Sequence, residues 1–194
     1  CGFGLPSDKI TVIHHGIDTE RFRDIKKKDI YKKYPQLRGH KVIFHPARMG
    51  LGKGCDISVK AMRLVKEAVP DAMLVLAGTK HIIDWGRVQQ KDIAYILNLV
   101  TRFDLRSDIL VEAFSREEVA GLYEVSKFAV YPSTVHEPFG LTMLEAMISN
   151  RPIIVTDTGG MPEVIKDGIN GFIIKSKDYQ MLAKRCIQLL KDSN

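Results

Sequence analysis

The chain has 194 residues, of which 45% are hydrophobic and 27% charged, so it is long enough to bury the core of one globular domain and is not typical of a disordered protein. No apolar run reaches the length that crosses a bilayer, and the first ten residues lack the charged and apolar regions of a signal peptide. The net charge is +6, and it comes from one segment. Three scattered cysteines argue against a disulfide framework or a zinc site. Because such cysteine usage is typical of a reducing compartment, we expect a cytoplasmic protein.

An N-terminal segment, residues 1–40, precedes the predicted core at 41–194, and we expect the two to form a single domain. The segment does not begin with methionine, so we interpret the chain as a fragment of a longer protein. Within it, the stretch KITVIHHGIDTERF (9–22) predicts a strand and a turn. A basic helix is expected to follow this turn.

The positive charge lies between residues 21 and 41, where nine Lys or Arg face two Asp. This segment alone carries +7, so the rest of the chain is close to neutral. The only tyrosines of this segment are Tyr31 and Tyr34, which are too few to form a platform on which nucleic-acid bases stack. Nucleic acid is therefore not expected as a partner. A solvated helix face is the preferred interpretation, and weak peripheral contact with an anionic membrane is the alternative.

From residue 41 onward, short apolar runs alternate with longer amphipathic stretches. The runs predict strands at 41–47, 72–78, 108–114, 127–133, 151–157 and 171–175. The stretches predict helices at 55–68, 86–102, 116–125, 141–149 and 179–191. Continuous apolar strands alternating with helices are typical of a parallel sheet covered on both faces, so we predict an α/β, doubly wound, Rossmann-like fold. Ligands of such sheets bind beyond the carboxyl ends of the strands. We therefore expect ligand-binding residues in the loops at 46–54, 78–85, 132–140 and 156–161.

The first of these loops, HPARMGLGKGCD (45–56), is rich in glycine and carries two cations. Gly50, Gly52 and Gly54 allow backbone N–H groups to approach a ligand, and Arg48 and Lys53 add positive charge before a helix N-terminus. This combination indicates a phosphate-binding site, although neither the dinucleotide nor the P-loop pattern is present. A flexible loop with two solvated cations is the alternative.

A second loop, HEPFGLTMLEAM (136–147), places one glutamate on each side of a Pro-Phe-Gly break. Glu137 is expected in the loop, because Pro138 and Gly140 cannot both lie inside a regular helix. Glu145 is expected one turn inside the helix that follows. The residues between them, where free amide N–H groups are expected, are Phe139, Gly140, Leu141 and Thr142. A ligand with both hydroxyls and anionic oxygens, such as a nucleoside diphosphate sugar, suits this layout.

The third loop, TDTGGMPEV (156–164), has two consecutive glycines after a strand and a proline suited to the first turn of a short helix. Turn formation alone is enough to explain this composition. The six histidines show no spacing typical of a metal site, and His136 is interpreted as a loop residue rather than a base.

Together, RMGLGKGCD, HEPFGLTMLEAM and TDTGGMPEVIKDGINGF resemble the retaining glycosyltransferases of group 1, also called family 4. Glu137 and Glu145 match the family's E-x7-E signature, and the resemblance covers nearly the whole chain. The family has two Rossmann-like domains facing a cleft, the GT-B architecture, and this chain is similar to the C-terminal, donor-binding one. The chain departs from the family's pattern at HPAR (45–48) and at TKHIIDWG (79–86). These loops are expected near the nucleotide, so the resemblance does not identify the nucleotide base.

The resemblance implies roles for particular residues. Arg48 and Lys53 would bind the donor diphosphate, Glu137 would contact the transferred sugar, and Glu145 would bind the ribose hydroxyls. The implied catalytic residues are Arg48, Lys53 and Glu137. The implied substrate-binding residues are Gly50, Gly52, Gly78, Phe139, Gly140, Leu141, Thr142 and Glu145. The resemblance implies no metal and no cofactor.

We therefore expect the donor-binding half of an enzyme of carbohydrate biosynthesis that moves a sugar from a UDP-, GDP- or ADP-sugar to an acceptor hydroxyl. Its second partner would be a missing N-terminal acceptor domain, without which the fragment is expected to be inactive. The alternatives are a non-catalytic sugar-nucleotide-binding module and another GT-B enzyme, such as a sugar-nucleotide epimerase or a phosphorylase. A third alternative is a nucleic-acid binder that uses the basic segment.

Overall fold

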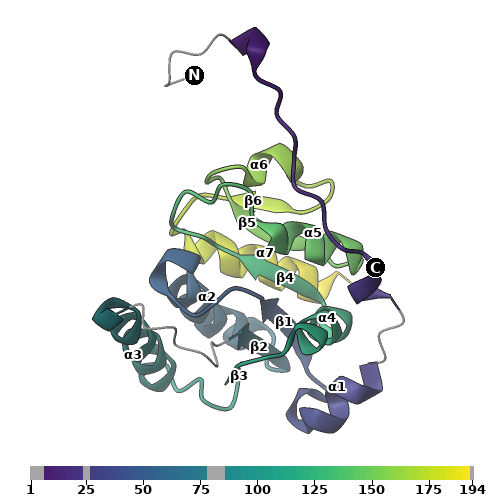
Figure 1. Ribbon diagram of the computed structural model, residues 1–194. Helices are drawn as coiled ribbons and strands as arrows, with labels where there is room; N and C mark the ends of the chain where they lie inside the picture. The colour runs from purple at the N-terminus through teal and green to yellow at the C-terminus, as the bar shows by residue number, and fades with distance from the viewer. Residues whose placement is uncertain (1–6, 24–26, 78–85, 193–194) are drawn as a thin grey trace.

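The computed structural model describes residues 7–23, 27–77 and 86–192 (Figure 1). Within them, six parallel strands form one sheet in the order β3-β2-β1-β4-β5-β6. The strands are β1 (Lys41–His45), β2 (Ala72–Ala77), β3 (Ile109–Glu112), β4 (Phe128–Tyr131), β5 (Ile153–Thr156) and β6 (Phe172–Ile174). The helices are α1 (Lys27–Lys33), α2 (Cys55–Ala68), α3 (Gly86–Arg102), α4 (Arg116–Val125), α5 (Leu141–Ile148), α6 (Met161–Val164) and α7 (Tyr179–Lys191).

Both faces of the sheet are covered, which confirms the predicted doubly wound fold. Ile43 contributes to the core formed with α2, α3 and α7, whereas its neighbours Val42 and Phe44 contribute to the core formed with α1, α4 and α5. All residues of β2, β4 and β5 are buried, as expected for strands packed on both sides. Figure 1 shows α2 and α7 together on one face of the sheet.

The strand order reverses between β1 and β4. From β1 the chain winds outward through β2 to β3, then returns to β4 and winds the other way through β5 to β6. The register pairs Ile43 with Phe128 and Phe44 with Ala129, so the loops that follow β1 and β4 leave the sheet side by side. This is the switch point at which open α/β sheets bind ligands.

The six predicted strands and five predicted helices of the core are all present, with ends that differ by up to two residues. The prediction of a strand within 9–22 is wrong. The segment contains the 3-10 turns Ser7–Lys9 and Glu20–Phe22, and between them it is extended but pairs with no described strand. Val12 and Ile13 are 74% and 87% exposed, so the apolar alternation that suggested a strand has no partner in the described residues. In Figure 1 this segment runs past α5 and α6 and beyond the body of the domain.

Candidate functional site

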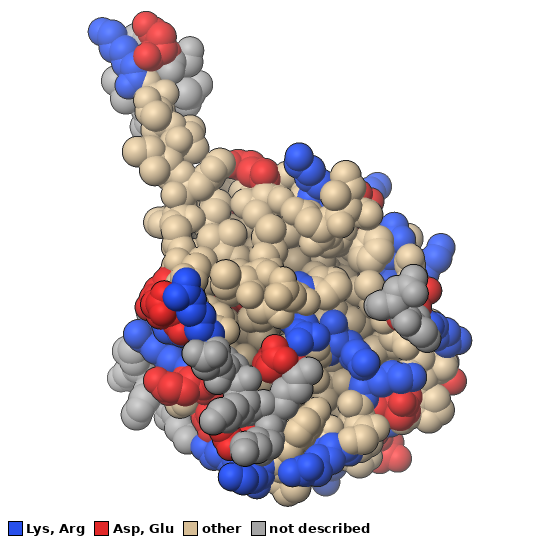
Figure 2. Space-filling view, turned by 90° about the vertical axis from the view of Figure 1, so that its right-hand side faces the viewer, with Lys and Arg blue, Asp and Glu red and all other residues tan. Residues whose placement is uncertain are grey.

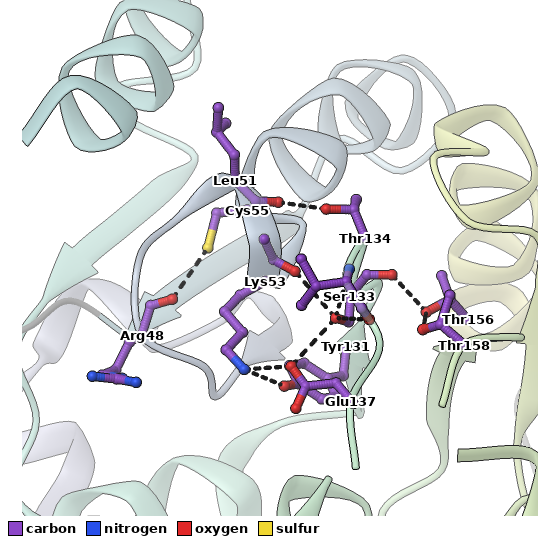
Figure 3. Close-up of polar contacts among 12 residues, drawn as sticks. Arg48, Leu51, Lys53, Cys55, Tyr131, Ser133, Thr134, Glu137, Thr156 and Thr158 are labelled. Carbon is purple, nitrogen blue, oxygen red and sulfur yellow. Dashed lines mark hydrogen bonds and ion pairs between the residues drawn. The ribbon is translucent and has the colours of Figure 1, made fainter. Parts of the chain in front are cut away.

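Three loops meet at the carboxyl edge of the sheet, after β1, β4 and β5 (Figure 3). Thr134 donates from Oγ1 to the carbonyl oxygen of Leu51 at 2.9 Å and from its backbone N–H to that of Gly52 at 3.0 Å. On the other side, Thr156 Oγ1 donates to the carbonyl oxygen of Ser133 at 2.8 Å. The loop after β4 is therefore held between its two neighbours.

The loop after β1 is shaped by close packing of backbone on backbone. It forms a 3-10 turn at Leu51–Lys53, and α2 begins two residues later, after Gly54. Gly54 has a φ of +74°, and a Cβ added to it would lie 1.9 Å from the carbonyl oxygen of Pro132. The Asp92 carboxylate on α3 accepts a hydrogen bond from the Leu51 amide at 3.1 Å. The sequence indicated Gly54 only as a glycine of a phosphate-binding loop and did not indicate Asp92, because the partners of both residues lie far along the chain.

Lys53 and Glu137 form an ion pair at the centre of the site. The side chains are 30% and 10% exposed, so the contact is largely shielded from solvent. Lys53 Nζ also lies 3.2 Å from the Tyr131 hydroxyl, and the Ser133 hydroxyl lies 3.4 Å from Glu137 Oε1. Burial alone would raise the pKa of Glu137, but the hydrogen bonds from Lys53, Tyr131 and Ser133 outweigh it, and this pKa lies below its ordinary value. Glu137 is therefore a carboxylate at neutral pH.

Tyr131 and Ser133 are site residues that sequence reasoning missed. Burial, followed by the hydrogen bond to Glu137, raises the pKa of Tyr131, so its hydroxyl stays protonated. The Ser133 hydroxyl lies 3.1 Å from the carbonyl oxygens of Gly52 and Val135. The sequence did carry a signal for Tyr131, because it lies in a strand predicted to be buried and a buried tyrosine hydroxyl needs a hydrogen-bond partner.

Helix α5 begins beside this cluster. Gly140 precedes it with a φ of +84°, and Phe139 is buried, with 8% of its surface exposed. The amides of Leu141 and Thr142 fall in the first turn, which has no intrahelical acceptors. Thr142 Oγ1 is buried and has no hydrogen-bond partner among the described residues.

Glu145 lies one turn further along α5, in a different environment from that of Glu137. Its Oε2 accepts a hydrogen bond from the Tyr123 hydroxyl at 3.2 Å. Burial raises the pKa of Glu145, and the hydrogen bond from Tyr123 and the charge of Arg21 oppose that effect without cancelling it. The two glutamates of the E-x7-E pattern therefore differ in their pKa shifts, one lowered and the other raised.

The remaining predicted residues are less closely associated with the ion pair. Arg48 is exposed at the start of the loop after β1, and Figure 3 shows its guanidinium extending away from the contact between Lys53 and Glu137. Gly50 has extended backbone, with a φ of 174°, and Gly52 lies next to Val135. Gly78 lies outside the described residues.

The departure at HPAR has a structural explanation. His45 is fully buried beneath the loop, with Nδ1 2.8 Å from the Ser58 hydroxyl and Nε2 3.6 Å from Cys55 Sγ. Burial, reinforced by the charge of Lys53, lowers the pKa of His45 to about 3, so the imidazole is neutral. In the described part of the chain, no group of three or more His, Cys, Asp or Glu side chains is arranged to hold a metal ion.

Several described cations of the basic segment have partners within the molecule. Lys33 forms an ion pair with Glu118, and Lys41 pairs with Asp71 at 3.3 Å. The Arg38 guanidinium lies 5.2 Å from the centre of the Tyr31 ring. On the face that Figure 2 shows, Lys and Arg side chains lie beside Asp and Glu, and several Lys and Arg side chains form a row across the middle. These contacts favour the interpretation of the basic segment as a solvated helix face over a membrane contact. None of the described helices is both long and apolar enough to span a membrane.

Comparisons with known proteins agree with this geometry. The family model described as glycosyl transferases group 1 matches residues 26–194. Two similar relatives are an uncharacterized glycosyltransferase, MJ1607, of Methanocaldococcus jannaschii and the putative glycosyltransferase EpsD of Bacillus subtilis. The first is 29% identical over 98% of this chain and the second 30% identical over 97%, and each match covers 47% of the relative. The chain thus spans about half the length of the curated relatives it matches.

Two solved structures share the fold. The C-terminal domain of a glycosyl transferase group 1 family protein, LpcC, from Francisella tularensis has a TM-score of 0.77 and 26% identity, with 92% of this chain and 89% of that one covered. Anabaena Alr3699/HepE, solved in complex with UDP-glucose, has a TM-score of 0.84 and 24% identity, with 98% of this chain and 50% of that one covered.

Proposed function

The chain belongs to the glycosyl transferases of group 1, and on that premise we propose that it is the donor-binding domain of a retaining, family 4 enzyme of GT-B architecture. Such an enzyme moves a sugar from a nucleotide-sugar to an acceptor hydroxyl. The observation that carries the proposal is the pairing of Lys53 with Glu137 at the switch point of the sheet, beside the open first turn of α5.

Lys53 is the proposed ligand of the donor diphosphate. Without a ligand its ammonium is neutralised by Glu137. A diphosphate offers Lys53 a stronger anionic partner, and its arrival releases the Glu137 carboxylate for the sugar. Arg48 supplies the second cation from the exposed start of the same loop. As the bond to the sugar breaks, negative charge grows on the diphosphate, and these fixed cations stabilise it.

Helix α5 holds the rest of the donor in this proposal. The amides of Phe139, Gly140, Leu141 and Thr142 face the sugar and the phosphates, where the positive end of the helix dipole favours an anion. The Thr142 hydroxyl, buried without a described partner, is a further donor for this ligand. Glu145 accepts hydrogen bonds from the ribose hydroxyls, sharing its carboxylate with Tyr123.

The acceptor would be bound by another domain. The LpcC structure that this chain covers almost completely is a C-terminal domain, and the matched relatives are about twice as long as this chain. Ile10, Val12 and Ile13 are exposed on the N-terminal segment, as expected for residues that another domain covers. Residues 1–194 would then be a single nucleotide-sugar-binding domain that cannot transfer sugar without its acceptor half.

A thermal-shift panel tests the proposal. The chain is heated with UDP, GDP and ADP and with the glucose derivative of each, and a ligand that binds the folded state raises the midpoint by mass action. HepE is solved with UDP and with UDP-glucose, so UDP-glucose is the first probe. We expect one base to be preferred and uridine or adenosine without phosphates to give no shift. No shift with any diphosphate at millimolar concentration would contradict the proposal.

A further inference from the structure

The loop after β5, residues 157–160, lies directly against the backbone of Glu137. The Gly160 amide donates to the Glu137 carbonyl oxygen at 3.0 Å. A Cβ added to Gly159 would lie 1.8 Å from that same oxygen and 2.7 Å from the Glu137 nitrogen. No side chain fits at residue 159 unless Glu137 moves.

We infer that the two glycines of TDTGG are positioning residues, which set the place of the Glu137 carboxylate opposite Lys53. This inference rests on the proposed function of Glu137 as the carboxylate that contacts the sugar. It gives the third loop a role beyond the turn chemistry that its sequence suggests.

Turn formation explains only one of the two glycines. Gly159 has a φ of +61°, which glycine adopts readily, but Gly160 has a φ of −81°, which suits any residue. What restricts Gly160 is its neighbour, because an added Cβ would lie 2.6 Å from the carbonyl oxygen of Pro138. The shared property of the two positions is therefore the close approach of the backbone at 137–138.

The loop is anchored firmly enough to position another residue. Thr156 is completely buried at the end of β5, an interior strand between β4 and β6, and it donates to the Ser133 carbonyl oxygen. The Asp157 amide donates to the Ile174 carbonyl oxygen at 2.9 Å. Figure 3 shows Thr156 and Thr158 on the far side of Ser133 from Lys53. The segment 133–137 is thus fixed from β5 at its first residue, Ser133, and at its last, Glu137.

The test compares Gly159→Ala with Gly168→Ala. Gly168 has a φ of +73°, so alanine suffers a similar backbone strain there, but nothing lies within 4 Å of the added Cβ. The first readout needs no ligand: the pKa of the Glu137 carboxyl is followed by carbon-13 NMR during a pH titration. If Glu137 is displaced from Lys53, Gly159→Ala raises this pKa toward the ordinary value of a glutamate, and Gly168→Ala leaves it as in the wild-type chain.

The second readout is the preference for a nucleotide-sugar over its nucleotide, measured by calorimetry with UDP-glucose and UDP. Gly159→Ala is expected to lower the preference about tenfold, the equivalent of one charge-assisted hydrogen bond, while UDP affinity changes much less. In a Glu137→Gln background the same glycine substitution should have little further effect, because coupled residues are not additive. A purely structural defect would instead weaken both ligands and add to Glu137→Gln.

Two milder variants keep the inference testable if Gly159→Ala does not fold. Gly160→Ala tests the contact with Pro138 without a positive φ, and Thr156→Val removes the hydroxyl that donates to Ser133 and contacts the Thr158 hydroxyl. Both should shift the Glu137 pKa in the same direction. An unchanged pKa in every folded variant overturns the inference while leaving the donor site intact. A shifted pKa in a chain that binds none of the glucose donors upholds the positioning and overturns the proposed function.

Discussion

Lys53 and Glu137 form an ion pair although 84 residues separate them in the sequence. Lys53 comes from the 3-10 turn before α2, and Glu137 comes from the loop between β4 and α5. Each half of the sheet therefore supplies one charge, and the ion pair links the loops that follow β1 and β4. In the proposed function this internal pairing is exchanged for pairing with the donor, so Lys53 contributes both to stability and to the affinity for UDP.

Lys53→Met should lower the free energy of unfolding by about 1–3 kcal/mol, because it leaves Glu137 buried without its main partner, although Lys53 is 30% exposed and solvent reduces the loss. The double variant Lys53→Met/Glu137→Gln should recover most of this stability but not the affinity for UDP. Urea unfolding and calorimetry measure the two effects separately. A single variant as stable as the wild type would show that the pair does not stabilise the fold.

The two glutamates should respond differently to conversion to glutamine. Glu145→Gln should weaken UDP binding about tenfold, because a charged acceptor for the ribose is lost. Glu137→Gln should leave UDP affinity close to that of the wild type but lower the turnover of the full-length enzyme about a hundredfold. Calorimetry of the chain and a transfer assay of the complete protein give the comparison. Loss of UDP binding in Glu137→Gln, with none in Glu145→Gln, would reverse the assignment.

Arg48→Ala should weaken UDP binding about tenfold to a hundredfold, the usual worth of one charge-assisted hydrogen bond. Uridine serves as the control ligand, since it lacks the diphosphate that Arg48 is proposed to bind. An equal loss for both ligands would indicate a general disturbance of the loop instead of a phosphate contact.

The stability of the chain should depend on the ionisation of Glu137 in acid. The folded-state pKa of Glu137 is lowered, so its contribution is complete above the pKa of the unfolded chain and is lost as the pH falls through the folded value. The melting temperature of the wild type should therefore fall from about pH 5 downward more steeply than that of Glu137→Gln. Parallel curves for the two proteins would show that the pairing contributes no pH-dependent stability.

Gly54→Ala should destabilise the chain by about 3 kcal/mol or more, because the new Cβ would meet the Pro132 carbonyl oxygen at 1.9 Å. Gly39→Ala is a matched control, since Gly39 has a φ of +77° and nothing lies within 4 Å of its added Cβ. The control should cost about 1–2 kcal/mol from left-handed strain alone. Equal losses in urea unfolding would mean that the contact with Pro132 relaxes easily.

The elements that the sequence predicted best are those whose signals are local. The apolar run of β2 and the helical spacing of α2 are properties of neighbouring residues, and both elements lie where they were expected. The strand predicted within 9–22 failed because strand formation depends on a partner that the described residues do not provide. The roles of Tyr131, Gly54 and Gly159 depend on contacts with distant loops, so spacing within one motif could not reveal them.

The reversal of strand order between β1 and β4 also has a consequence for how the molecule folds. Residues near each other in the chain build each half of the sheet, but the site exists only after the halves dock along β1 and β4. Contacts of such long range form late, because loop-closure entropy must be overcome first. During refolding, secondary structure should therefore recover before UDP binding does. In native-state hydrogen exchange, an opening of the β4–β6 half would abolish nucleotide binding while the β1–β3 half remains protected.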